Sequence, residues 1–170
     1  GSGDNTFLVR LKSEKEKLKN ERSILEIQSL FQQAFKDKKI TGLIIQPFFE
    51  GISEGEYACV FLDSELTHVA KRYPGIFETK KEPIEILHVP KEVQQLALDC
   101  QEALVDISDK IRKGYKPVYS RCDIIKNKGK YFLMEAEMAE PDLLIRTISS
   151  PKKKSEVIGK LARIISERSR

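Results

Sequence analysis

Residues 119–141, YSRCDIIKNKGKYFLMEAEMAEP, contain the pattern on which the fold prediction depends. Two apolar runs flank a short polar segment that contains glycine, which is the pattern of a β-hairpin. Three carboxylates, Asp123, Glu135 and Glu137, interrupt these runs at positions where a core would favour Val or Leu. The acids belong either to a polar sheet face in solvent or to a site that binds a cation.

The length of the turn decides whether these acids lie together. Side chains alternate between the two faces of a strand. Gly129 favours a three-residue loop over residues 127–129, and that loop would place Arg121 opposite Glu135, with Asp123 diagonal to it. The second strand would then present four side chains to the same face: Tyr131, Leu133, Glu135 and Glu137. A two-residue turn would direct one of the two sets away from the other.

If the three carboxylates converge, their mutual repulsion must be neutralised. Clusters of carboxylate oxygens suit Mg²⁺, which keeps several waters and also accepts phosphate oxygens. Arg121, on the same face, offers a planar fork that can bind a phosphate or a carboxylate. From the hairpin alone, a solvated polar face remains the alternative.

The composition is that of a globular protein of one domain or two compact subdomains. The 170 residues are 40% hydrophobic and carry a net charge of +4, from 30 basic and 26 acidic residues. This balance, without interleaved aromatic and basic residues, argues against nucleic acid as a partner. No apolar run approaches the roughly 20 residues of a membrane span, so no membrane partner is expected. Gly1–Gly3 is interpreted as a cloning remnant, and the three cysteines as reduced thiols of a cytoplasmic protein.

Apolar spacing and turn residues predict the helices and strands along the chain. Strands are expected at 7–11, 43–49, 55–63, 66–73, 84–89, 118–126 and 130–138. Helices are expected from about residue 24 to 35, over 91–112, and from Ser150-Pro151 onward. The last two helices should bury the following residues: Val93, Leu96, Ala97, Cys100, Leu104, Ile107, Ile111, Val157, Leu161, Ile164 and Ile165. Strands paired by hairpins, with long helices on one face, predict an α+β fold with an antiparallel sheet.

The order of these segments resembles the ATP-grasp superfamily. The segments that carry the resemblance are IIQPFFEG, GEYACVFLD, THVAKR, a long helix, RCD and the E-x-E of the hairpin, from about residue 43 to about residue 145. The sequence is most similar to the glutathione-synthetase-like branch of carboxylate–amine ligases, which includes D-alanine–D-alanine ligases, ribosomal-protein glutamate ligases and cycloserine-pathway ligases. The resemblance implies that 43–170 is the carboxy-terminal nucleotide- and metal-binding subdomain. It also implies that 4–42 is a remnant of the small lid subdomain.

The resemblance also assigns roles to individual residues. Residues resembling those that bind ATP are Ile45, Gln46 and Phe48 for adenine, Glu56 for the ribose, and His68, Lys71 and Arg72 for the phosphates. Residues resembling the Mg²⁺ ligands are Asp123, Glu135 and Glu137. Arg121 resembles the catalytic arginine that stabilises the transferred phosphoryl group. The implied reaction joins a small-molecule carboxylate to an amine, or to a peptide acceptor, through an acyl phosphate.

The amino-terminal region departs from the family pattern. Relatives carry a glycine-rich loop in the lid, whereas no glycine lies between Gly3 and Gly42 here. Arg10 or Lys12 could stand in for the lid lysine, and a partner chain in a homodimer could supply the lid. In relatives, much of the acceptor pocket lies in an amino-terminal domain. Two hypotheses follow: a ligase domain, and a degenerate module of the same fold that binds a nucleotide or acts as a scaffold without turnover.

Overall fold

In the computed structural model, the described residues are 8–9, 21–22, 28–29, 32–33, 36, 48–73 and 81–169. The chain divides into two units. The first comprises Gly1–Glu50 and Pro74–Lys80, and the second comprises Gly51–Tyr73 and Lys81–Arg170. This division falls at residue 50. The boundary of the lid subdomain expected at residue 42 stays a prediction.

In the first unit, the described residues form a short parallel ladder and part of a helix. β1 (Leu8–Val9) pairs with β2 (Glu21–Arg22), so the strand expected at 7–11 is present at its centre. Residues 28–29, 32–33 and 36 are helical and exposed, as expected for the polar side of the helix predicted near residues 24–35. The apolar stripe of that helix, the candidate lid residues Arg10 and Lys12, and the adenine candidates Ile45 and Gln46 lie outside the described residues.

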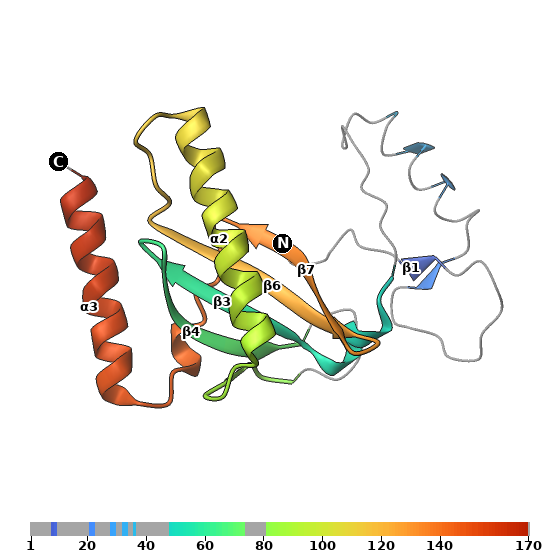
Figure 1. Ribbon diagram of the computed structural model, residues 1–170. Helices are drawn as coiled ribbons and strands as arrows, with labels where there is room; N and C mark the ends of the chain where they lie inside the picture. Colours follow the sequence, from blue (N-terminus) through green and yellow to red (C-terminus); the bar gives the residue numbers. More distant parts are fainter. Residues whose placement is uncertain are drawn as a thin grey trace. The chain divides into compact units, whose positions relative to one another are not determined.

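The second unit contains a five-stranded antiparallel sheet in the order β5-β4-β3-β6-β7 (Figure 1). The strands are β3 (Glu56–Leu62), β4 (Glu65–Arg72), β5 (Ile84–Glu85), β6 (Tyr119–Asn127) and β7 (Lys130–Glu137). The hairpin expected at 55–73 is present, and it turns through Asp63 and Ser64, both with positive φ. The expected class, α+β with an antiparallel sheet, is confirmed.

The sheet begins after a short 3₁₀ helix, η1 (Glu50–Glu54), that contacts the tip of the β6–β7 hairpin. The Gly51 amide donates a hydrogen bond to Asn127 Oδ1 at 3.2 Å. A Cβ at residue 51 would lie 1.8 Å from the Lys126 carbonyl oxygen, so only glycine fits this approach.

Helix α2 (Lys91–Ile111) covers one face of the sheet (Figure 1). Its apolar residues are spaced by threes and fours, so Val93, Ala97 and Leu104 lie on one stripe. That stripe packs against four side chains of the two central strands: Cys59, Phe61, Cys122 and Ile124. The buried stripe continues to Ser108, which is 4% exposed, and Ile107 lies beside it. The predicted burial of Ile107 and Ile111 is therefore wrong, because they are 49% and 80% exposed.

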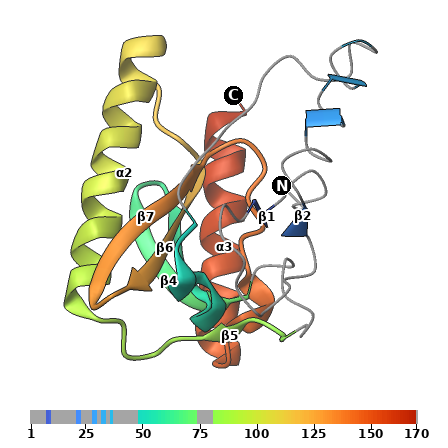
Figure 2. The same cartoon turned by 90° about the vertical axis from the view of Figure 1, so that its right-hand side faces the viewer.

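Helix α3 (Pro151–Arg168) packs with residues of the opposite face (Figure 2). Ser150 caps it by accepting a hydrogen bond from the Lys153 amide, as predicted from Ser150-Pro151. Val157 and Ile164 are buried against Leu62, whereas Ile165 is 48% exposed, contrary to its predicted burial. Because Leu62 and Phe61 point to opposite faces, the helices are divided between the two faces rather than packed on one.

Both faces of the sheet are covered at its central strands, which explains why β3 is mostly apolar. β3 is buried at six of its seven positions, because α2 lies over one face and Leu144 and α3 lie over parts of the other. In the described part of the chain, none of the helices is both long enough and apolar enough to cross a membrane.

Candidate functional site

The β6–β7 turn has two residues, and a β-bulge restores the alignment of the acids. Asn127 pairs with Lys130, so the turn consists of Lys128 and Gly129, with φ of 48° and 80°. The predicted three-residue loop is therefore wrong. Farther along, Ile124 pairs with Leu133 but Asp123 pairs with Glu135, which leaves Met134 as an extra residue.

The bulge reverses the faces to which the side chains in the second half of β7 point. Leu133 shares the α2 face with Ile124, while Glu135 and Glu137 share the opposite face with Asp123. The prediction that Tyr131 and Leu133 lie with the two glutamates is wrong for this reason. The predicted pairing of Arg121 with Glu135 is also replaced, because Arg121 pairs with Glu137.

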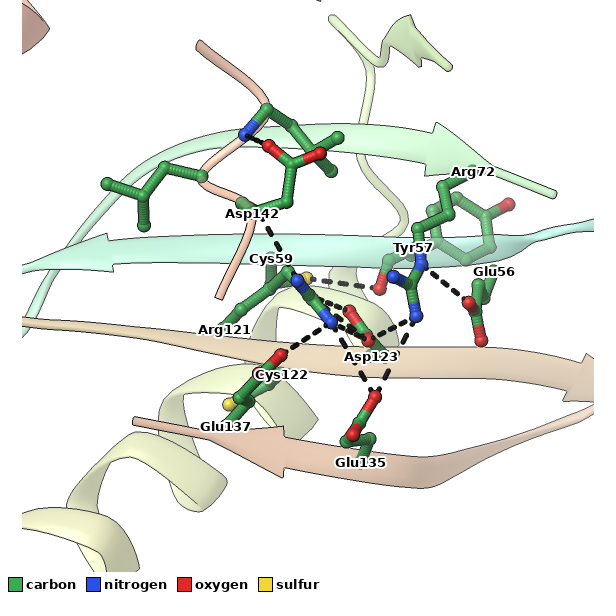
Figure 3. Close-up of polar contacts among 12 residues, drawn as sticks. Glu56, Tyr57, Cys59, Arg72, Arg121, Cys122, Asp123, Glu135, Glu137 and Asp142 are labelled. Atoms are coloured by element: carbon green, nitrogen blue, oxygen red, sulfur yellow. Dashed lines mark hydrogen bonds and ion pairs between the residues drawn. The ribbon is translucent and has the colours of Figure 1, made fainter. Parts of the chain in front are cut away.

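Six charged side chains meet on this face of the sheet (Figure 3). They come from four adjacent strands: Glu56 from β3, Arg72 from β4, Arg121 and Asp123 from β6, and Glu135 and Glu137 from β7. We call this set the acid–arginine cluster. Four carboxylates surround two guanidinium groups, so positive charge only partly compensates negative charge.

Arg121 lies at the buried centre of the cluster. Its side chain is 2% exposed, and its Nε and Nη2 atoms each donate to Asp123 at 2.8 Å. Nη2 also lies 2.9 Å from Glu137 Oε2, and Nη1 donates to the Asp142 carbonyl at 3.3 Å. Burial by itself would lower the pKa of Arg121, but the hydrogen bonds and negative charges of the acids outweigh it and raise the pKa.

Arg72 joins the buried Glu56 to Asp123 at the centre of the cluster. Its Nε donates to Glu56 at 2.6 Å and its Nη2 donates to Asp123 at 2.8 Å. Burial raises the pKa of Glu56 more strongly than the Arg72 charge lowers it, so the net shift is upward. The Arg72 side chain is 29% exposed, which distinguishes it from the enclosed Arg121.

The acids differ in their access to solvent. The Asp123 side chain is 1% exposed and both of its oxygens accept from arginine, whereas the Glu135 side chain is 45% exposed. Glu135 Oε2 lies 3.6 Å from Arg121 Nη2 and 3.8 Å from Arg72 Nη2, so its contacts are the loosest of the set. Glu137 is intermediate, with 16% exposure.

The carboxylate oxygens of the cluster are chemically suited to bind Mg²⁺. Hard divalent cations prefer oxygen ligands of this kind. Among the residues that the structure describes, no group of three or more His, Cys, Asp or Glu side chains is arranged to hold a metal ion. The carboxylates converge on the guanidinium groups, and these groups supply the positive charge between them.

The segment after β7 closes over one end of the cluster. Leu144 packs on Ala58 and Ala70, and the Asp142 carboxylate accepts from the Leu144 amide at 2.9 Å. His68 holds the same segment, because its Nε2 lies 2.8 Å from the Leu143 carbonyl oxygen and must donate to it. Burial lowers the pKa of His68.

The other candidates are not brought into the cluster. Lys71 lies on the α2 face, with its Nζ 4.2 Å from the centre of the Tyr57 ring, and burial lowers its pKa. His68 lies on the cluster's face but is 3% exposed, with both ring nitrogens in hydrogen bonds. Phe48 is 39% exposed and belongs to the first unit, so its place relative to the cluster is not defined.

Two features were missed in the sequence. Asp142 supplies a backbone acceptor to Arg121 and holds Leu144 in its left-handed conformation, with φ of 51°. The Pro141-Asp142 pair is a turn signal from which this segment could have been predicted. The direct Glu56–Arg72 pair has no local signal, because it depends on the register between β3 and β4.

The fold of this chain is similar to that of two solved enzymes. D-cycloserine synthetase superposes with a TM-score of 0.56 at 17% identity, over 74% of this chain and 42% of that one. A D-alanine–D-alanine ligase from Bacillus anthracis, complexed with ATP, superposes with a TM-score of 0.52 at 20% identity, over 86% and 47%. No protein-family model matches the chain, and no curated protein matches it in sequence.

These similarities define the fold of the chain. It has the ATP-grasp fold, as the sequence resemblance predicted. The chain spans less than half of the length of either neighbour, and at this level of identity the likeness concerns the fold alone.

Proposed function

We propose that this chain is the nucleotide-binding part of an ATP- and Mg²⁺-dependent carboxylate–amine ligase that acts through an acyl-phosphate intermediate. The main support for this proposal is the acid–arginine cluster, in which four carboxylates and two arginines from four strands meet on one face of an ATP-grasp sheet. Both neighbours are named as enzymes that form a bond between small molecules, which supports the general kind of reaction.

The chemistry requires that one anion approach another. A substrate carboxylate attacks the γ-phosphorus of ATP, the bond to ADP breaks, and an amine then displaces phosphate from the acyl phosphate. Arg121 is proposed to face the transferred phosphoryl group, where a fixed positive charge stabilises the charge that develops. Its contacts with Asp123, Glu137 and the Asp142 carbonyl hold it in one position, as preorganised stabilisation needs.

Asp123, Glu135 and Glu137 are the proposed Mg²⁺ ligands. Glu135 is the most open of the three, so it is the first carboxylate that an incoming cation would meet. A bound Mg²⁺ would neutralise phosphate charge and orient the nucleotide. Arg72 and Glu56, which pair with each other beside Asp123, are proposed to contact the phosphates and the ribose, respectively. Ile45, Gln46 and Phe48 remain proposed adenine contacts from the resemblance alone.

The second candidate is a module of the same fold that binds ATP without turnover. The observation that favours it is the lack of glycine between Gly3 and Gly42, where relatives carry a flexible phosphate-binding loop. In either case, the three free thiols are typical of a reducing compartment, which supports a cytoplasmic location.

Calorimetric titration with ATP, with and without Mg²⁺, tests the binding site. Glu135→Gln should weaken Mg²⁺-dependent ATP binding by about tenfold or more, since it removes one anionic ligand of the cation. Glu102→Gln is the matched control, because Glu102 is exposed on α2, across the sheet from the cluster. Equal affinities for the two variants would refute the proposed site.

Phosphate release then separates the two candidates. ATP would be incubated with the chain and with panels of carboxylates and amines, D-alanine among them. Release that depends on both substrates, together with a new amide in mass spectra, supports the ligase. Tight ATP binding without release supports the module that binds without turnover.

A further inference from the structure

Two of the three thiols are in direct contact where α2 packs on the sheet. Cys100 lies on α2 and Cys122 lies on β6, 22 residues farther along the chain, and their Sγ atoms are 3.1 Å apart. Because a disulfide bond is about 2 Å long, the two sulfurs need to approach by only about 1 Å to form one. Both residues are free thiols in this structure.

The two thiols differ in their access to solvent. Cys122 is fully buried, whereas Cys100 is half-buried, beside the core residues that α2 packs on the sheet. The Cys122 thiol donates its hydrogen bond to Cys100, which lowers the pKa of Cys100 and favours its thiolate. A small oxidant therefore reaches Cys100 first, and the thiol that can react with the oxidised sulfur is already in contact with it.

Cys59 provides a comparison within the same core. It lies directly opposite Cys122 on β3 and is equally buried, but its Sγ donates a hydrogen bond to the Tyr57 carbonyl at 4.0 Å. The hydrogen bond of Cys59 is thus with the backbone rather than with a thiol. A half-buried sulfur and a thiol partner in contact with it are combined in Cys100 and Cys122.

We propose that Cys100 and Cys122 form an oxidation site, a dithiol that a hydroperoxide converts into an intramolecular disulfide. The Cys100 thiolate attacks the hydroxyl oxygen of the hydroperoxide: an S–O bond forms, the O–O bond breaks, and the leaving oxygen takes up a proton. Cys122 then attacks the sulfur of this sulfenic acid, so that the S–S bond forms, the S–O bond breaks, and hydroxide leaves as water with the Cys122 proton. The two sulfurs lose two electrons in total, and the hydroperoxide gains them.

The disulfide would join α2 to the strand that carries the centre of the acid–arginine cluster. Cys122 stands between Arg121 and Asp123 in β6, and the side chains of these two neighbours point to the opposite face of the sheet. In a reducing compartment such a disulfide is transient, because soluble thiols restore the dithiol. The inference goes beyond the proposed function and does not depend on it, since the two thiols need no nucleotide to react.

Peptide mass mapping of the whole chain after treatment with hydrogen peroxide tests the site. Cleavage after lysine and arginine places the three cysteines on three different peptides. We expect one linked pair, which contains Cys100 and Cys122 and separates on addition of dithiothreitol, while Cys59 stays free for alkylation after unfolding. The site is refuted if peroxide leaves Cys100 and Cys122 unlinked, links either of them to Cys59, or joins two chains through Cys100.

Variants of the three cysteines test the order of the steps. In Cys122→Ala the sulfenic acid on Cys100 has no thiol in contact, so dimedone should label Cys100 far more than in the wild type at the same peroxide dose. Cys59→Ala is the matched control, because it is the same substitution at the other fully buried cysteine, and it should form the disulfide as the wild type does. Equal labelling of Cys100 in Cys122→Ala and the wild type, or a folded Cys59→Ala without the disulfide, would refute the site. If a variant does not fold, the mapping of the wild type decides by itself.

Discussion

Asp123 and Glu135 lie directly opposite each other on β6 and β7 because Met134 is an extra residue in β7. Without this bulge, the two-residue turn would pair Asp123 with residue 134, and Glu135 would point toward α2. One residue thus keeps two glutamates off the α2 face and brings them to Arg121 and Arg72.

Two single-residue deletions should have opposite effects on the cluster. Deletion of Met134 removes the bulge and leaves Glu135 opposite Asp123, so the hairpin should stay paired. Deletion of Ala136 leaves the bulge but turns Glu137 toward the α2 face, at the exposed position of Ala136, so the buried Arg121 loses its contact with Glu137. We expect the second deletion to lower the free energy of unfolding by about 2 kcal/mol more than the first, as measured by urea titration. Equal losses of stability would contradict this account of the bulge.

Stability should depend on pH through His68. Its pKa is lowered below the ordinary 6.5, chiefly by burial, so the folded chain holds fewer protons on this group than the unfolded chain. The stabilisation is present above pH 6.5 and is lost as the pH falls from 6.5 toward the folded pKa. Urea unfolding between pH 5 and pH 8 should show this decline, and His68→Gln should flatten it.

The contact between β5 and the start of α3 should be sensitive to acid. Burial alone would raise the pKa of Glu85, but hydrogen bonds from Ser149 and Lys153 outweigh it and lower the pKa to about 2. The stabilisation is full above the ordinary value of 4.5 and is lost as the pH falls toward 2. At pH 7, Glu85→Gln should lower the free energy of unfolding by about 1–2 kcal/mol. Glu102→Gln, on the exposed face of α2, should change it little.

The three thiols should react in a fixed order. Cys59 and Cys122 are fully buried, and burial raises the pKa of Cys59 to about 12. Cys100 is half-buried, and a hydrogen bond from the Cys122 thiol, 3.1 Å away, lowers its pKa. Alkylation at pH 8 followed by peptide mass analysis should find Cys100 modified first. Modification of Cys59 at the same rate would show that the core opens readily.

The helices and the hairpin could be predicted because their signals are local. The spacing of Val93, Ala97 and Leu104 defines the buried stripe of α2, and Ser150-Pro151 marks the start of α3. The same periodicity could not show that the stripe continues through Ser108 and leaves Ile107 exposed, because the packing of α2 on the sheet decides which of two neighbouring positions is covered.

The site was harder to predict than the fold. Asp123, Glu135, Glu137 and Arg121 were identified as a group that shares one sheet face, and the structure brings them together, but through a bulge rather than a longer turn. Arg72 and Lys71 are neighbours in sequence and were assigned together. They point to opposite faces because strand residues alternate.

The sequence by itself determined the order of strands and helices, the antiparallel hairpins and the residue types of the site, since alternation, helical spacing and turn residues act over a few positions. Only the tertiary structure decided that Glu56 and Arg72 join the acids, and that the arginines lie between the carboxylates. These contacts join residues 16 and 51 positions apart, and they depend on the register of four strands at once. A one-residue bulge changes that register, and no local pattern around Met134 specifies where it lies.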